Sequence, residues 1–120
     1  MDIRLKRAYD DPADNDGYRV LVDRVWPRGV CRDELKLDEW LKEVAPSDEL
    51  RKWFGHEEEK WKEFRWRYIR ELEEKQEELV PLLERLHAEK RVTLVFGSSD
   101  EEHNNAVALK DYLKDRLQQS

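Results

Sequence analysis

The clearest hydrophobic pattern is a nearly continuous run of apolar and β-branched side chains at residues 18–22, which predicts a central strand covered on both faces. Residues 91–96 give a second clear strand. Residues 3–7 alternate apolar with basic side chains, which predicts an edge strand with one buried face. Residues 10–17 are almost entirely Asp, Asn, Pro and Gly, the composition of an exposed loop.

Apolar side chains at three- or four-residue intervals predict helices over most of the remaining chain. Ser47 is a suitable N-cap for a short helix, because its hydroxyl can accept a hydrogen bond from a main-chain amide, and Gly55 is well placed to end that helix. Pro81 is compatible with a helix if it falls in the first turn. The expected helices cover residues 37–44 weakly, then 48–54, 57–75, 77–89 and about 101–117.

The order of these elements predicts a parallel sheet, because parallel neighbours need a crossover connection. We expect one domain over residues 1–120 with an α/β fold: a small, mainly parallel sheet flanked by helices, as in a Rossmann-like three-layer sandwich. Strand 18–23 should lie beside strand 92–96. Ligands bind beyond the carboxyl ends of such strands, so the loops at residues 26–29 and 97–100 should meet on one rim.

Composition narrows the function classes. The 120 residues carry a formal net charge of −6, which argues against broad, sequence-independent nucleic-acid binding. Cys31 is the only cysteine, so no internal disulfide can form, and we interpret it as an inert thiol rather than a nucleophile. No signal-like or membrane-spanning apolar run is present, and we expect a cytoplasmic protein without membrane association. The sequence leaves a homo-oligomer open.

The loop after the central strand is the first candidate site. Arg24 and Arg28 flank Trp26 at a spacing that could bring two guanidinium groups to one anion, with the indole as a stacking wall. The structural alternative is equally strong: Trp26 packs as a lid, Pro27 and Gly29 shape the turn, and the arginines pair with carboxylates. Both interpretations stay open from sequence alone.

The loop after the second strand offers a further anion contact. Ser98 and Ser99 lead from a strand into a helix, where hydroxyls, main-chain amides and the positive helix end could hold an anion. The glycine and lysine spacing of a phosphate loop is missing. For either serine alone, a role as a helix N-cap is the stronger interpretation.

The segment that follows supplies candidate proton-transfer groups. His103 could act as an acid or base, with Glu102 beside it, while Asp100 and Asn104 could bind a substrate; a solvated helix cap is the structural alternative. His56, which follows the aromatic pair that includes Trp53, could also reach the site. The ligand spacing of an H-E-x-x-H motif is missing, so we expect no metal site.

Five segments together resemble a known family. They are Tyr18–Gly29, Trp40–Lys42, Ala45–Ser47, Leu50–His56 and Asp100–Asn104. Their V-D-R-x-W-P-R-G and W-F-G-H motifs resemble the YeaO-like family of bacterial and archaeal proteins, a domain of unknown function. The resemblance covers nearly the whole chain and implies a small cytoplasmic α/β domain, without an activity to carry over.

Two departures from the family pattern bear on the candidate residues. The loop before the acidic segment is often Tyr-Ala-Ala-like in the family, whereas this chain has Phe96-Gly97-Ser98-Ser99. A second histidine often follows the asparagine, and here that position is Asn105. These differences weaken a role for the serines and for paired histidines as metal ligands.

Three functional hypotheses follow. The first is a site for a small anionic ligand, phosphate- or nucleotide-like, at the carboxyl-terminal rim of the sheet, whether or not a reaction occurs there. The second is a protein-interaction or regulatory module that presents Trp26 and Trp53 and performs no chemistry. The third is a metal-dependent hydrolase that uses His56, His103 and Glu102. The cofactor is unknown in each case.

Overall fold

Four parallel strands form the centre of the molecule in the computed structural model, which describes residues 2–118. The strand order is β1-β4-β2-β3. The predicted strands are confirmed, including the parallel pairing of β2 with β4 and the edge position of β1. The strands are β1 (Asp2–Arg7), β2 (Tyr18–Leu21), β3 (Glu39–Trp40) and β4 (Arg91–Phe96).

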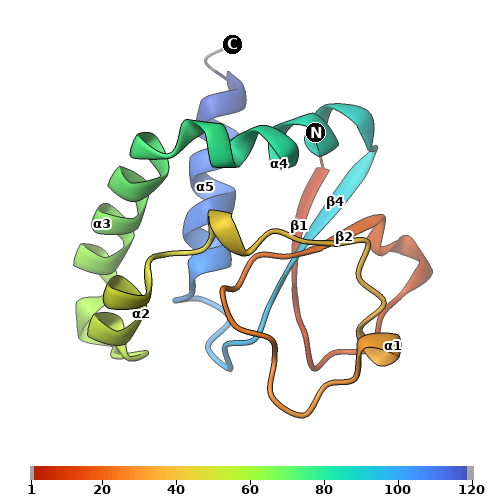
Figure 1. The fold of residues 1–120 in the computed structure, drawn as a ribbon, viewed down its shortest axis with the longest axis horizontal. Helices are drawn as coiled ribbons and strands as arrows, with labels where there is room; N and C mark the ends of the chain where they lie inside the picture. Colours follow the sequence, from red (N-terminus) through yellow and green to blue (C-terminus); the bar gives the residue numbers. More distant parts are fainter. Residues whose placement is uncertain (1, 119–120) are drawn as a thin grey trace.

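Five helices surround the sheet and complete the predicted α/β sandwich (Figure 1). The helices are α1 (Arg32–Leu35), α2 (Asp48–Phe54), α3 (Trp61–Glu74), α4 (Gln76–Ala88) and α5 (Asn105–Gln118), with 3₁₀ turns at Asp14–Asp16 (η1), Lys42–Val44 (η2) and Glu58–Lys60 (η3). Within residues 2–118, no helix has the length and apolar character needed to cross a membrane.

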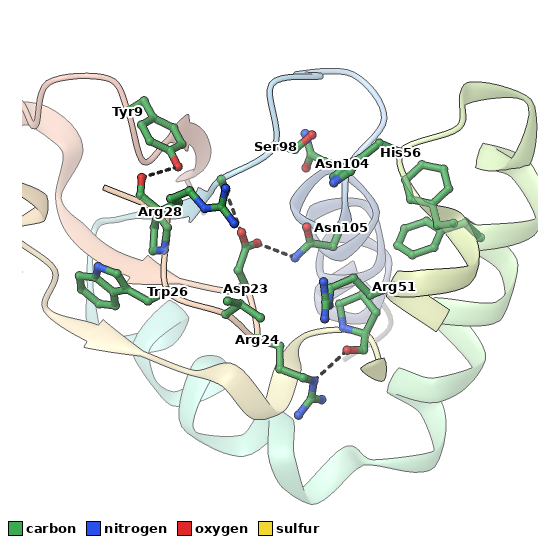
Figure 2. A pocket seen from close by; sticks show the side chains of 16 residues that line it. Tyr9, Asp23, Arg24, Trp26, Arg28, Arg51, His56, Ser98, Asn104 and Asn105 are labelled. Atoms are coloured by element: carbon green, nitrogen blue, oxygen red, sulfur yellow. Dashed lines mark hydrogen bonds between the residues drawn. The ribbon is translucent and has the colours of Figure 1, made fainter. Parts of the chain in front are cut away.

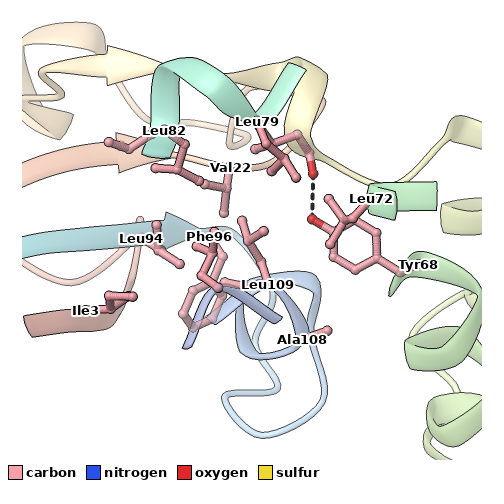
Figure 3. Packing of buried hydrophobic residues seen from close by; sticks show 14 of the residues in the cluster. Ile3, Val22, Tyr68, Leu72, Leu79, Leu82, Leu94, Phe96, Ala108 and Leu109 are labelled. Atoms are coloured by element: carbon pink, nitrogen blue, oxygen red, sulfur yellow. Dashed lines mark hydrogen bonds between the residues drawn. The ribbon is translucent and has the colours of Figure 1, made fainter. Parts of the chain in front are cut away.

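The two faces of the sheet are covered unequally, because alternate side chains of each strand enter separate clusters. Val20 and Leu94 belong to the large cluster on the face covered by α2 to α5, where Tyr68, Leu79 and Leu109 contribute to the packing (Figure 3). On the opposite face, a smaller cluster forms beneath α1 and its flanking loops. It comprises Ala8, Leu21, Leu35 and Val95, with Trp26, Val30, Leu37 and Trp40 packed against it.

The weak helix expected over residues 37–44 is wrong. Glu39–Trp40 pairs with β2 as the edge strand β3, and the chain then turns through η2. The Trp40 indole donates a hydrogen bond of 2.7 Å to the main-chain oxygen of Asp23. Three apolar residues at helical spacing were too weak a signal against this tertiary pairing, and the short helix α1 was missed.

Helix α2 is bounded as its sequence predicts. The Ser47 hydroxyl accepts a hydrogen bond from the Leu50 amide at 3.1 Å, and Gly55 follows the last helical residue. The Glu71 carboxylate of α3 also binds Ser47, accepting from its amide at 2.8 Å and from its hydroxyl at 2.7 Å. These bonds fix the start of α2 on α3.

Helix α5 begins at Asn105, so the expected start near residue 101 is wrong. Asp100 instead holds a turn, because its carboxylate accepts hydrogen bonds from the amides of Glu102 and His103 at 2.9 and 3.0 Å. The Asn104 side chain then caps the helix by accepting from the Val107 amide at 3.0 Å. The acidic segment is therefore a loop in front of α5.

Two smaller expectations also need correction. Pro81 lies inside α4 in its second turn rather than its first, at an exposed position where the freed carbonyl can bond to water. The loop at residues 10–17 is largely exposed, but Asp16 is buried. Its carboxylate binds the buried Arg19 at 2.6 Å and Lys6 at 3.1 Å.

Candidate functional site

A cavity of about 230 Å³ opens beyond the carboxyl ends of β2 and β4, where the two loops meet (Figure 2). Its polar lining comprises Tyr9, Asp23, Arg24, Arg28, Arg51, His56, Ser98, Asn104 and Asn105. Its remaining lining comprises Val25, Trp26, Pro27, Pro46, Phe54, Phe64 and Gly97. The meeting of the loops on one rim follows from the parallel pairing of β2 with β4.

Asp23 lies at the centre of this cavity, two residues beyond the end of β2. Its carboxylate accepts hydrogen bonds from the Gly97 amide at 2.8 Å and from the Asn105 side-chain amide at 3.1 Å (Figure 2). Burial raises the pKa of the Asp23 carboxyl, and these two bonds and the charges of His56 and Arg51 offset that effect only partly. Asp23 therefore joins β2, β4 and α5 through one partly desolvated carboxylate.

The three arginines of the lining differ in how many partners their guanidinium groups have within the protein. Arg24 is turned toward main chain, donating to the carbonyls of Pro46 at 3.0 Å and Ala45 at 3.3 Å (Figure 2). Arg51 is exposed and makes one surface contact, at 3.2 Å to Asp48. In the part of the chain that the structure describes, the exposed guanidinium of Arg28 has no hydrogen-bond or ion-pair partner. Arg28 and Arg51 can therefore turn to an incoming ligand.

His56 reaches the cavity from the segment after α2. Its backbone has a φ of 60°, a left-handed conformation that few residues other than glycine adopt. The exposed imidazole contacts the ring of Phe54, with centroids 6.1 Å apart. Such a conformation at a cavity wall places the imidazole where it can serve as a donor or acceptor.

Trp26 contributes more to packing than to an open binding wall. Its indole nitrogen donates to the Val30 carbonyl at 2.7 Å, and its ring meets Trp40 edge-on with centroids 5.4 Å apart. Tyr9 steadies the same loop by donating its hydroxyl to the Arg28 carbonyl at 2.9 Å. The tight turn therefore presents Arg28 on a supported loop.

The second loop divides its candidate residues between the cavity and the outer surface. Ser98 and Asn104 line the cavity, where the Ser98 hydroxyl accepts from the Asp100 amide at 3.1 Å. Asn104 is buried and caps α5, so its side chain has a structural task. The other candidates of this loop are not part of the cavity lining: Ser99, Asp100, Glu102 and His103.

His103 does not line the cavity that His56 lines. The His103 ring binds the Asp100 carboxylate at 3.0 Å and meets Trp61 edge-on at 5.4 Å, outside the cavity lining. Hydrogen bonds to the Asp100 carboxylate, the one from the Glu102 amide foremost, lower its pKa. Among residues 2–118, no three His, Cys, Asp or Glu side chains are grouped so that they could hold a metal ion.

Trp53 also lies outside this cavity. Its ring is flanked by Arg67 and Lys60, whose charged groups lie 4.5 and 5.1 Å from its centroid. These contacts place it in a shallow surface groove between α2 and α3. Trp53 is therefore separate from the residues that surround Asp23.

Four polar lining residues were not among the sequence-based site candidates: Tyr9, Asp23, Arg51 and Asn105. Asp23 and Arg51 stand inside the segments that carry the family resemblance, so the motif itself could have indicated them. Asn105 replaces the histidine often found after the asparagine. Tyr9 follows the edge strand and carries no local signal, because its role depends on a loop almost twenty residues further on.

Comparison with known proteins gives a consistent grouping. A sequence model described as the inactive DUF488-N3 subclade matches residues 2–120. The uncharacterised protein YeaO of Escherichia coli is 41% identical over 114 residues, which cover 95% of this chain and 98% of YeaO. The uncharacterised protein Rv3073c of Mycobacterium tuberculosis is 38% identical, with 95% of each chain covered. No solved structure matches the chain.

Proposed function

The chain belongs to the YeaO-like family, and we propose that it binds a small anion in the cavity beyond β2 and β4 without converting it to a product. The observation that carries this proposal is a pair of exposed guanidinium groups in the lining of a cavity that His56 also lines. Arg28 has no side-chain partner among the described residues, and Arg51 makes only one exposed contact, to Asp48. Guanidinium groups bind phosphate and carboxylate through parallel N–H donors.

The local charge supports this proposal because it opposes the charge of the whole protein. The formal net charge is −6, yet the cavity lining holds three arginines and one histidine against the single carboxylate of Asp23. Basic side chains in a concave site raise the local concentration of anions. The surrounding negative surface disfavours large polyanions, so a small ligand fits better than nucleic acid.

The size of the cavity sets a limit on the ligand. Its volume of about 230 Å³ is below the ~300–1,000 Å³ that is typical of pockets for drug-sized molecules. A phosphate, a sulfate or a small phosphorylated compound fits inside. A nucleotide would place only one of its parts there and leave the rest in solvent.

Binding without turnover agrees with the positions of the candidate catalytic groups. His103 and Glu102 do not line the cavity, and both oxygens of Asp23 already accept hydrogen bonds from the protein. The matching subclade is described as inactive. A cytoplasmic location fits the single, exposed thiol of Cys31.

Calorimetric titration with inorganic phosphate and pyrophosphate at low ionic strength tests this proposal. Arg28→Ala should weaken binding about tenfold, the effect of losing a charge-assisted hydrogen bond of about 1.5 kcal/mol at an exposed position. Arg32→Ala is the matched control, because Arg32 is an exposed arginine on α1 that does not line the cavity. The control changes the net charge equally and should leave the affinity within about twofold.

Nuclear magnetic resonance locates the bound anion. The amide signals of Gly97 and Asn105 should shift in a saturable way when phosphate is added, because both residues line the cavity. Equal affinities of the Arg28→Ala variant and the wild type would overturn the proposal. Shifts confined to the surface around Trp53 would overturn it as well, and would instead support an interaction module.

A further inference from the structure

Two parts of the cavity lining differ in exposure: Asp23 and Asn105 are half-buried, and we call them the floor, whereas Arg28 and Arg51 are exposed, and we call them the mouth. We propose that the bound anion also carries an N–H donor group, which Asp23 and Asn105 receive at the floor while Arg28 and Arg51 hold the anionic group. This inference rests on the proposed function and adds the chemical class of the ligand: a small phosphate- or carboxylate-bearing compound with an ammonium or amino group.

Asp23 has acceptor capacity that the protein does not use. An ionised carboxylate offers about four lone-pair positions, and only two are taken, by the Gly97 amide and the Asn105 side chain. No Lys, Arg or His of residues 2–118 lies within ion-pair distance of this carboxylate. The negative charge at the floor therefore lacks a direct cationic partner within the described chain.

Asn105 also contributes an acceptor, its side-chain oxygen. Its amide nitrogen uses its two hydrogens on the Val22 carbonyl and on the Asp23 carboxylate, each at 3.1 Å. The nitrogen end of the amide therefore faces Asp23 (Figure 2), and the oxygen takes no part in either bond. Across the described residues, nothing donates a hydrogen bond to that oxygen.

The contacts of Asp23 within the protein leave its charge without a positive partner. One oxygen accepts from the Gly97 amide and the other from the Asn105 side chain, and both donors are neutral. A buried charge costs free energy that a neutral side chain would avoid. The raised pKa of Asp23 shows that this cost is only partly offset within the protein. A ligand cation or N–H group would supply the missing partner.

Part of the cavity lining is apolar. Phe54 and Phe64, whose ring centroids lie 4.2 Å apart, contribute to it together with Val25. Such a lining offers no hydrogen bonds, so it suits the short carbon segment that joins an amine to a phosphate.

Three phosphate esters that differ in their nitrogen group test this inference on the wild-type protein. Phosphoethanolamine carries an ammonium group, ethyl phosphate lacks it, and phosphocholine keeps the positive charge without an N–H donor. We expect phosphoethanolamine to bind at least tenfold more tightly than either of the other two in calorimetric titrations.

Variants identify the residues responsible for the preference. Asp23→Asn removes the charge of the side chain, so the ratio of the affinity for phosphoethanolamine to the affinity for ethyl phosphate should fall to about one. Arg28→Ala should weaken both compounds by the same factor. The ligand preference is also measured on the wild-type protein, so it remains a test even if Asp23→Asn does not fold.

The possible results separate this inference from the proposed function. If phosphoethanolamine binds no more tightly than ethyl phosphate or phosphocholine, the donor requirement is refuted and the anion site stands. If none of the three esters binds, the proposed function fails as well. A preference for phosphoethanolamine over both other esters supports the inference and identifies the donor as an ammonium group.

Discussion

Ser47 provides the sharpest stability test, because one hydroxyl serves two helices. It accepts the Leu50 amide as the N-cap of α2 and donates to the Glu71 carboxylate of α3 at 2.7 Å. Ser47→Ala removes both interactions and leaves the main-chain bond to Glu71 in place. The substitution should destabilise the protein and loosen α2, which carries Arg51.

The expected magnitude follows from the two lost hydrogen bonds. Loss of an N-cap hydroxyl costs about 1 kcal/mol. The half-buried bond to the Glu71 carboxylate adds about 1 kcal/mol, below the range for fully buried charged partners. With an unfolding entropy of about 2.1 cal/mol/K per residue, a total of about 2 kcal/mol lowers the melting temperature by about 8 °C.

Thermal unfolding followed by circular dichroism measures this effect. Ser99→Ala is the matched control, since Ser99 is exposed and its side chain makes no hydrogen bond within residues 2–118. It should change the melting temperature by less than about 2 °C, the effect of an exposed substitution. Ser47→Thr retains the hydroxyl and should behave like the control. Equal melting temperatures for Ser47→Ala and Ser99→Ala would refute the capping argument.

Three further outcomes are expected. Tyr68→Phe should lower the free energy of unfolding in urea by about 1–3 kcal/mol, because it leaves the buried Val44 carbonyl, now bonded at 2.5 Å, without a donor. Gly17→Ala should lower the free energy of unfolding by about 3 kcal/mol or more, since the φ of Gly17 is 72° and a Cβ would lie 2.4 Å from a main-chain oxygen of β4. Gly29→Ala should lower it by only about 1 kcal/mol, because Gly29 has a φ of 77° but open space around it. Equal losses would contradict the steric argument. Because the pKa of Asp23 is raised in the folded state, protonation of its carboxyl favours folding. This contribution to the free energy of unfolding is fully present below the ordinary pKa of 3.8 and is lost as the pH rises through the folded-state pKa. The stability of Asp23→Asn relative to the wild type, measured by urea unfolding, should therefore increase from pH 4 towards neutral pH, and a pH-independent difference would disprove this linkage.

The sequence predicted best the features whose signals are local. The β-branched runs at residues 18–22 and 91–96 indicate strands wherever they pack, and their parallel pairing followed from the helices between them. Ser47 and Gly55 mark the ends of α2 through bonds that span only three or four residues. The convergence of the two loops was likewise predictable, because neighbouring parallel strands end at the same edge of a sheet.

Features that depend on distant partners were not predictable. Strand β3 exists because it pairs with β2, about twenty residues earlier, and the apolar spacing of residues 37–44 contains no trace of that contact. Arg24 was predicted as an anion contact, yet the Pro46 carbonyl lies within its reach and engages it. The same limit applies to Asp23, whose hydrogen-bond partners follow it by 74 and 82 residues.

Two local irregularities of this structure occur at the same cavity, and their coincidence is informative. Asp23 keeps a partly desolvated carboxylate without an ion-pair partner among the described residues, and His56 adopts a left-handed backbone. A partly desolvated charge and a left-handed backbone at a residue other than glycine each cost free energy. They come from separate elements, the end of β2 and the segment after α2, so no single packing constraint explains both. Natural sequences concentrate such departures where a ligand repays them, and this favours our proposal of a binding site around Asp23 over one in the acidic loop of His103.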